Sequence, residues 1–107
     1  MHIGQFFRLG TWTVKRENVP KFIEAWQSSA AWITGNLGGD GEGVLLQDSD
    51  HPGKFVSFAS SSNPEEAQEV MSRPEFQELW SSVMELCEDV QPHRMHVVAY
   101  SDPQPDG

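Results

Sequence analysis

Hydrophobic and polar positions along this chain repeat with the period of a β-strand in some segments and with that of an α-helix in others. The changes from one period to the other predict the elements of secondary structure. Residues Phe6 to Lys15 are rich in Phe, Leu, Thr, Trp and Val, a composition that predicts a β-strand. Apolar residues then recur at helical spacing as far as Asn36, which predicts an amphipathic helix. Asn18 can cap this helix, and Pro20 falls in its first turn, where a missing N–H costs nothing.

The middle of the chain predicts a β-hairpin. The runs Val44 to Asp48 and Lys54 to Ser60 are short and apolar, and residues 48–53 between them are dense in turn formers. A glycine-rich connection, residues 38–43, precedes the hairpin. It follows a helix and leads into a strand, the reverse of a phosphate-binding loop, so we interpret it as a plain connection.

Two helix-start signatures follow the hairpin. Asn63-Pro64-Glu65-Glu66 combines a cap residue, a first-turn proline and a glutamate able to close a capping box, and Ser72-Arg73-Pro74-Glu75 repeats the pattern. We therefore expect a short helix and then a second one. The apolar stripe of the second helix comprises Phe76, Leu79, Trp80, Val83 and Cys87. Arg94 to Tyr100 predicts the last strand, and residues 102–107 predict a frayed tail.

The order of these elements is βαββαβ, which predicts a single ferredoxin-like α+β domain with a structured core of about residues 6–101. Its helices can cover only one face of a four-stranded antiparallel sheet. Val44-Leu45-Leu46 and Val97-Val98-Ala99, however, place apolar groups on both faces. We therefore expect a homodimer through the sheet face, the alternative being a monomer with an apolar sheet surface.

Composition narrows the classes of partner. The chain has 107 residues, a net charge of −9 and seven scattered basic residues, which argues against binding to nucleic acid or to a membrane surface. No apolar run approaches a membrane span. The first five residues lack the features of a secretory signal, and Cys87 is the single cysteine. These features predict a cytoplasmic protein.

With its elements laid out, the chain resembles the antibiotic biosynthesis monooxygenase family from Phe7 to Tyr100. The segments that carry the resemblance are Gly10–Lys15, Val19–Trp26, Phe55–Phe58, Ser61–Ala67 and Arg73–Leu79. The resemblance implies a dimeric α+β barrel with a ligand cavity between the sheet and the helices of each subunit. It also implies an enzyme that oxidises electron-rich phenols of the anthrone type with O₂ and without a cofactor.

The chain departs from the family at positions that matter for chemistry. A Trp after the third strand and a Tyr in the next helix line the cavity of the quinone-forming members. Here the matching places hold Ser60-Ser61-Ser62 and Gln68. The haem-degrading members need an Asn, a Trp and an axial His where this chain has Leu9, Val70 and Trp80. Trp80 cannot ligate iron, which argues against haem degradation.

We expect a small hydrophobic ligand in the cavity, held by aromatic and apolar walls. The residues predicted to bind it are Leu9, Thr11, Val56, Phe58, Val70, Phe76, Trp80 and Met84. His96 is the best base by residue type, and Arg94, on the same face of the last strand, could hold an oxyanion. The alternative is that this face meets the dimer partner or solvent.

The other tryptophans are interpreted structurally. Trp12 is predicted to face the partner subunit, Trp26 to pack in the core and Trp32 to lie at an interface or edge. Cys87 is interpreted as a small hydrophobic residue.

No metal site or cofactor is predicted. His93 and His96 are three apart on a strand, so they point to opposite faces. A hairpin turn accounts for Asp48, Asp50 and His51.

Three functional hypotheses follow. The first is a cofactor-independent monooxygenase acting on a small aromatic or polyketide-like molecule. The second is a non-catalytic ligand-binding or stress-response protein that uses the same cavity. The third is a structural dimer whose cavity is filled by its own side chains. The missing family aromatics favour the second and third hypotheses.

Overall fold

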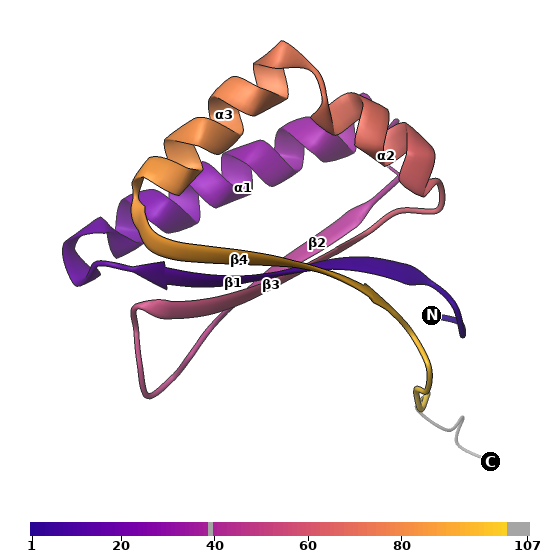
Figure 1. Ribbon diagram of the computed structural model, residues 1–107, viewed down its shortest axis with the longest axis horizontal. Helices are drawn as coiled ribbons and strands as arrows, with labels where there is room; N and C mark the ends of the chain where they lie inside the picture. The colour runs from indigo at the N-terminus through magenta and orange to yellow at the C-terminus, as the bar shows by residue number, and fades with distance from the viewer. Residues whose placement is uncertain (39, 103–107) are drawn as a thin grey trace.

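The protein is a four-stranded antiparallel sheet with all its helices on one face, as Figure 1 shows. The structure, a computed structural model, describes residues 1–38 and 40–102. Its elements run β1(Phe6–Val14), α1(Val19–Asn36), β2(Glu42–Gln47), β3(Lys54–Ser60), α2(Pro64–Met71), α3(Pro74–Glu85) and β4(Cys87–His96). The strand order is β2-β3-β1-β4. The ferredoxin-like α+β fold predicted from the sequence is therefore confirmed.

The start of α1 differs from the prediction in one detail. The helix begins at Val19 and ends at Asn36, but the Asn18 side chain makes no capping hydrogen bond. A short 3-10 turn, Arg16–Asn18, leads directly into the helix and leaves Asn18 with helical dihedral angles. Its Nδ2 instead donates to the carbonyl oxygen of Leu86, 3.5 Å away.

The hairpin of β2 and β3 closes through the predicted turn. Asp48 Oδ1 accepts the backbone N–H groups of Asp50 at 2.8 Å and of His51 at 3.0 Å. Those hydrogen bonds favour the ionised carboxylate, so they lower the pKa of Asp48. The acidic cluster at this turn therefore has a structural explanation.

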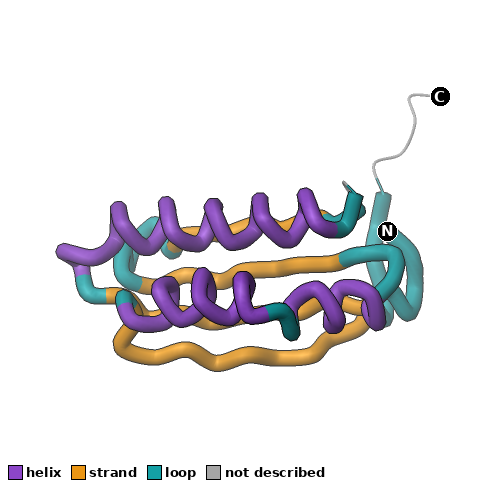
Figure 2. The backbone as a smooth tube through the Cα atoms, turned by 90° about the horizontal axis from the view of Figure 1, so that it is seen from above, coloured by secondary structure: helices purple, strands orange, loops and turns teal. Residues whose placement is uncertain are grey.

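Both helix starts predicted on the second half of the chain are found, but only the first has its side-chain cap, because Arg73 is the N-cap of α3 and the Ser72 hydroxyl donates to the carbonyl oxygen of Glu69. Asn63 Oδ1 accepts the backbone N–H of Glu66 at 3.1 Å, the hydrogen bond expected of an N-cap. The chain then breaks after Met71 and restarts as α3 at Pro74. Seen from above in Figure 2, α2 and α3 form one row of helix, and α1 forms the other.

The last strand is where the prediction was wrong. β4 begins at Cys87 rather than Arg94, ends at His96 rather than Tyr100, and thus takes Cys87 out of the second helix. Glu88, Asp89 and Pro92 disfavour a central strand, which explains the error. β4 is an edge strand, where proline is tolerated because its missing N–H faces no partner.

The core fills one end of the space between sheet and helices. Its buried centre comprises Trp12, Val14, Phe22, Phe55 and Val83. The Phe22 ring lies 5.3 Å from that of Trp12 and 4.8 Å from that of Phe55, centroid to centroid. Trp12 is 2% exposed and points toward the helices, so the prediction that it faces a partner subunit is wrong. Trp32 packs on a second small cluster made by Leu37, Ala67 and Val70.

The opposite face of the sheet carries no helix among the described residues (Figure 1), and the strand register places apolar side chains along its middle. The register pairs Leu9 with Phe58 and Thr11 with Val56 on that face, which we call the open face. Leu46 is 49% exposed there and Val44 41%. Among the described residues, no helix is both long and apolar enough to cross a membrane.

The residues beyond Asp102, which belong to the predicted tail, and Gly39 of the glycine-rich connection lie outside the described residues.

Candidate functional site

A cavity of about 610 Å³ lies between the helices and the end of the sheet that the core leaves unfilled. Its origin is visible in the strand sequences. On the helix-facing side the bulky Trp12 and Phe55 fill one end, whereas the other end has the small residues Gly10, Ser57 and Ala59. Ala59 is exposed although helices cover this face, because its methyl group opens onto the cavity. The volume suits a small organic molecule.

The strands form the floor of the cavity, and Gly10 lies where this floor meets the core. A larger residue would not fit at this position. A Cβ atom at this position would lie 2.8 Å from Ser57 Oγ and 2.9 Å from Trp12 Nε1. Those two atoms are themselves joined by a hydrogen bond of 2.9 Å, in which the indole N–H donates. The glycine thus permits a buried hydrogen bond that satisfies the only polar atom of the Trp12 side chain.

Aromatic rings form the wall. Trp80 stacks on Phe76 with centroids 5.4 Å apart and meets the ring of Trp12 edge-on at 5.2 Å. Trp26 reaches the cavity from α1. A planar apolar ligand could therefore stack against these rings.

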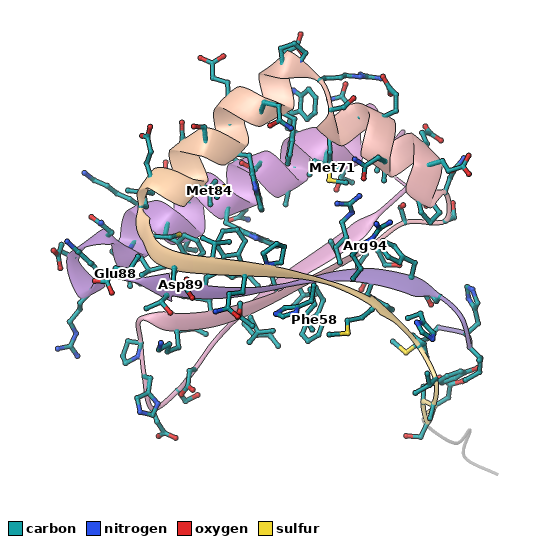
Figure 3. The ribbon with its side chains drawn as sticks, in the orientation of Figure 1. Phe58, Met71, Met84, Glu88, Asp89 and Arg94 are labelled. Carbon is teal, nitrogen blue, oxygen red and sulfur yellow. The ribbon has the colours of Figure 1, made fainter. Side chains whose placement is uncertain are left out.

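Two arginines supply the positive charge of the site, which Glu42 also borders. Arg8 on β1 and Arg94 on β4 are directly opposite in the register, and both line the cavity. Figure 3 shows Arg94 on the helix side of the sheet. The guanidinium carbons of Arg8 and Arg94 lie 6.0 Å and 5.6 Å from the centroid of the Phe6 ring. Arg8 also donates a hydrogen bond to Oε1 of Gln68 on α2. Burial, and secondarily the charge of Arg94, lower the pKa of Arg8.

The structure places four of the residues predicted from the sequence in the cavity wall, and a fifth, Leu9, borders the cavity. Phe76, Trp80, Met84 and Arg94 all line the cavity. Val70 does not line it, because this side chain is 1% exposed in the small cluster under α2.

The strand residues predicted to bind ligand also come together, but on the other side of the sheet. Leu9, Thr11, Val56 and Phe58 form two adjacent cross-strand pairs on the open face. Figure 3 shows Phe58 pointing away from the helices. Leu9 borders the cavity, yet the register pairs it with Phe58. A one-residue shift in strand assignment exchanges the two faces, which accounts for the difference.

His96 shares the helix-facing side of β4 with Arg94, but it is exposed and is not among the residues that line the cavity. His93 borders the cavity, although it pairs with Leu9 on the open face.

Sequence reasoning missed Arg8, Gly10 and Ser57 as parts of the site. An available signal was the alternation Arg8-Gly10-Trp12, which places a charged, a small and a bulky residue on one side of β1. Trp26, interpreted as core, does pack against it and also borders the cavity. Within residues 1–38 and 40–102, no three His, Cys, Asp or Glu side chains come close enough to hold a metal ion.

Solved structures with the same fold share little sequence with this chain. SnoaB, a cofactor-independent oxygenase from Streptomyces nogalater, matches with a TM-score of 0.80 at 15% identity, over 94% of this chain and 99% of that chain. A candidate antibiotic biosynthesis monooxygenase from Nitrosomonas europaea matches with a TM-score of 0.74 at 13% identity, over 91% and 93%. A conserved protein from Methanosarcina mazei Go1 matches with a TM-score of 0.71 at 14% identity, over 88% and 93%.

No protein-family model matches the sequence, and no curated protein matches it. The structural likeness nevertheless spans almost the whole chain. The resemblance to the antibiotic biosynthesis monooxygenases is therefore confirmed in the fold, and at these identities it defines the fold alone.

Proposed function

We propose that this chain, which has the fold of the antibiotic biosynthesis monooxygenases, is a cofactor-independent oxygenase of small, hydrophobic aromatic molecules. The observation that carries the proposal is the cavity, in which a wall of Trp80, Phe76 and Trp12 stands beside a cationic end formed by Arg8 and Arg94. A planar phenol would stack on the rings and place its oxygen at the guanidinium groups.

The proposed reaction needs only the substrate and O₂. A methylene carbon activated by the phenol loses a proton, and the resulting anion passes an electron to O₂. The radical pair forms a carbon–oxygen bond, and the peroxide then loses water to leave a carbonyl. One oxygen atom of O₂ enters the product and the other leaves as water, so four electrons are accounted for. The arginines would stabilise the anion, and the apolar walls would protect it from solvent.

His96 remains our proposal for the base, under a geometric condition. It lies two residues beyond Arg94 on the same side of β4 and outside the cavity lining. It could therefore take a proton only from a substrate that extends beyond Arg94 and out of the cavity toward His96.

A ligand-binding protein without catalysis is the second candidate. It is favoured by the absence of a family-type aromatic at Ser60–Ser62 and at Gln68, and by the position of His96 outside the cavity. In either case we propose a cytoplasmic homodimer.

Oxygen uptake by the purified protein tests the proposal, with anthrones, naphthols and catechols as substrates and no added cofactor. We expect uptake that falls at least about tenfold in Trp80→Ala, because the stacking wall is lost. Tyr100→Ala is the control, since it also truncates an aromatic residue but at a position that is 42% exposed and does not line the cavity. Circular dichroism checks that both variants fold.

Uptake that is equal in the two variants would contradict the assignment of the cavity as the active site. No uptake with any compound, together with measurable binding of an aromatic ligand, would favour the ligand-binding candidate.

A further inference from the structure

The opposed arginines break a local rule of sheet stability. Arg8 and Arg94 occupy directly opposite positions on β1 and β4, both on the helix-facing side. Like charges at such positions repel, because the Cβ atoms of opposed residues are only about 5 Å apart. Departures of this kind in an otherwise consistent fold are expected at functional sites.

Nothing among the described residues neutralises this charge. The chain is rich in acidic residues, with 16 against 7 lysines and arginines, yet no carboxylate of the described residues pairs with Arg8 or Arg94. Within residues 1–38 and 40–102 the ion pairs closer than 4.0 Å are His51–Asp48 and Arg73–Glu69, both elsewhere. Glu42 borders the cavity, but the register places it opposite Ser60, on the side of β2 that bears Val44.

The contacts that do exist orient the arginines without neutralising them. Gln68, a neutral amide, accepts a hydrogen bond from Arg8. Both guanidinium groups also lie near the ring of Phe6, with Arg94 the closer at 5.6 Å. The lowered pKa of Arg8 is consistent with a cation that is partly desolvated beside a second cation. An anion bound between them would remove the repulsion.

We infer that the cavity takes an aromatic carboxylic acid, with the carboxylate held by Arg8 and Arg94 and the rings against Trp80 and Phe76. This inference rests on the proposed function and names its substrate class more closely. A guanidinium fork matches the two oxygens of a carboxylate, and the second arginine gives the acid a second charged hydrogen-bond donor. A carboxylate offers two oxygen atoms to the two guanidinium groups, whereas a phenolate offers one.

The experiment compares two ligands that differ in charge but share their rings. Isothermal titration calorimetry measures binding of 2-naphthoate and of its neutral methyl ester to the wild-type protein, Arg8→Gln, Arg94→Gln and Arg16→Gln. We expect the wild type to prefer the acid by about tenfold or more, since hydrogen bonds to charged groups are the stronger ones. Either cavity variant should reduce this preference several-fold. Arg16→Gln removes the same charge from an exposed turn and should leave it unchanged.

Two outcomes would overturn the inference. One is equal binding of the acid and the ester by the wild type. This result would contradict the carboxylate site alone, because the oxygenase proposal is tested separately by oxygen uptake. The other is an acid preference that survives in both Arg8→Gln and Arg94→Gln, because the carboxylate would then be bound elsewhere. Arg94 is exposed, so its variant keeps the test informative if Arg8→Gln fails to fold.

Discussion

Cys87 lies on an edge strand, yet its surroundings predict a thiol of low reactivity. It is the first residue of β4, half-buried against the core, and its Sγ lies 3.4 Å from the carbonyl oxygen of Val83, to which it donates. Burial raises the pKa of its thiol from an ordinary value of 9.0 to about 11. Desolvation disfavours the thiolate, so the thiol form is retained in the folded protein.

We predict that Cys87 reacts slowly with thiol reagents in the folded protein. A pKa about two units higher reduces the thiolate fraction roughly 100-fold at neutral pH. Alkylation by iodoacetamide, followed by mass spectrometry in native buffer and in urea, measures this difference. Because the folded state binds the proton more tightly, the free energy of unfolding should fall as pH rises from about 9 to about 11. A native rate equal to the rate in urea would contradict the prediction.

At the residue scale the sequence predicts the aromatic wall better than the floor. Trp80 and Phe76 lie on a helix whose apolar stripe is clear, so their direction follows from the spacing alone. The floor depends on which side of β1 faces the helices. Leu9 and Trp12 are both apolar and lie on opposite sides, so alternation could not decide the matter.

Among the elements, α1 and α2 offer a matched pair of asparagines at their starts. Asn63 caps α2 with its side chain, whereas Asn18 precedes α1 without a capping hydrogen bond. We predict that Asn63→Ala lowers the free energy of unfolding by about 1 kcal/mol, the usual contribution of such a cap. Asn18→Ala should cost clearly less, because it loses only a weak contact of 3.5 Å to Leu86.

Urea denaturation of the two variants measures this difference. Equal destabilisation would mean that Asn18 contributes as much through Leu86 as Asn63 does through its cap. Destabilisation by Asn18→Ala alone would contradict the assignment of the caps.

The boundaries of the elements could be predicted wherever capping residues, prolines or turn formers mark them in the sequence. Pro64 and Pro74 mark the starts of α2 and α3, and residues 54–60 form β3 as predicted. β4 carries no such signal, since Glu88 to Pro92 resemble a loop and become a strand only by pairing with β1. Tertiary pairing overrides propensity there.

On the scale of the whole molecule, the open face has apolar side chains that no helix in the described part of the chain covers. Cross-strand neighbours cover its middle with apolar side chains from all four strands: Phe7, Leu9, Val44, Leu46, Val56, Phe58 and Met95. Charged side chains lie toward the two ends of this face, with Lys54 and Asp89 beside Thr13 at one end and Glu42 beside Ser60 at the other. An exposed apolar patch of this kind is typical of an interaction surface.

A second copy of the chain is the partner we predict for this face. Two sheets packed face to face would remove the apolar side chains of both copies from water at once, and the charged helix surfaces would stay outside. Sedimentation velocity should therefore give twice the 12.0 kDa mass of the chain. Phe58→Glu should shift the protein to monomer, because a carboxylate at the middle of the face would be buried without a partner. Ile23→Glu makes the same change on α1, where the side chain is 38% exposed, and should leave the mass unchanged. A wild-type protein that sediments as a monomer at tens of micromolar would contradict the dimer, and the apolar face would then need another partner.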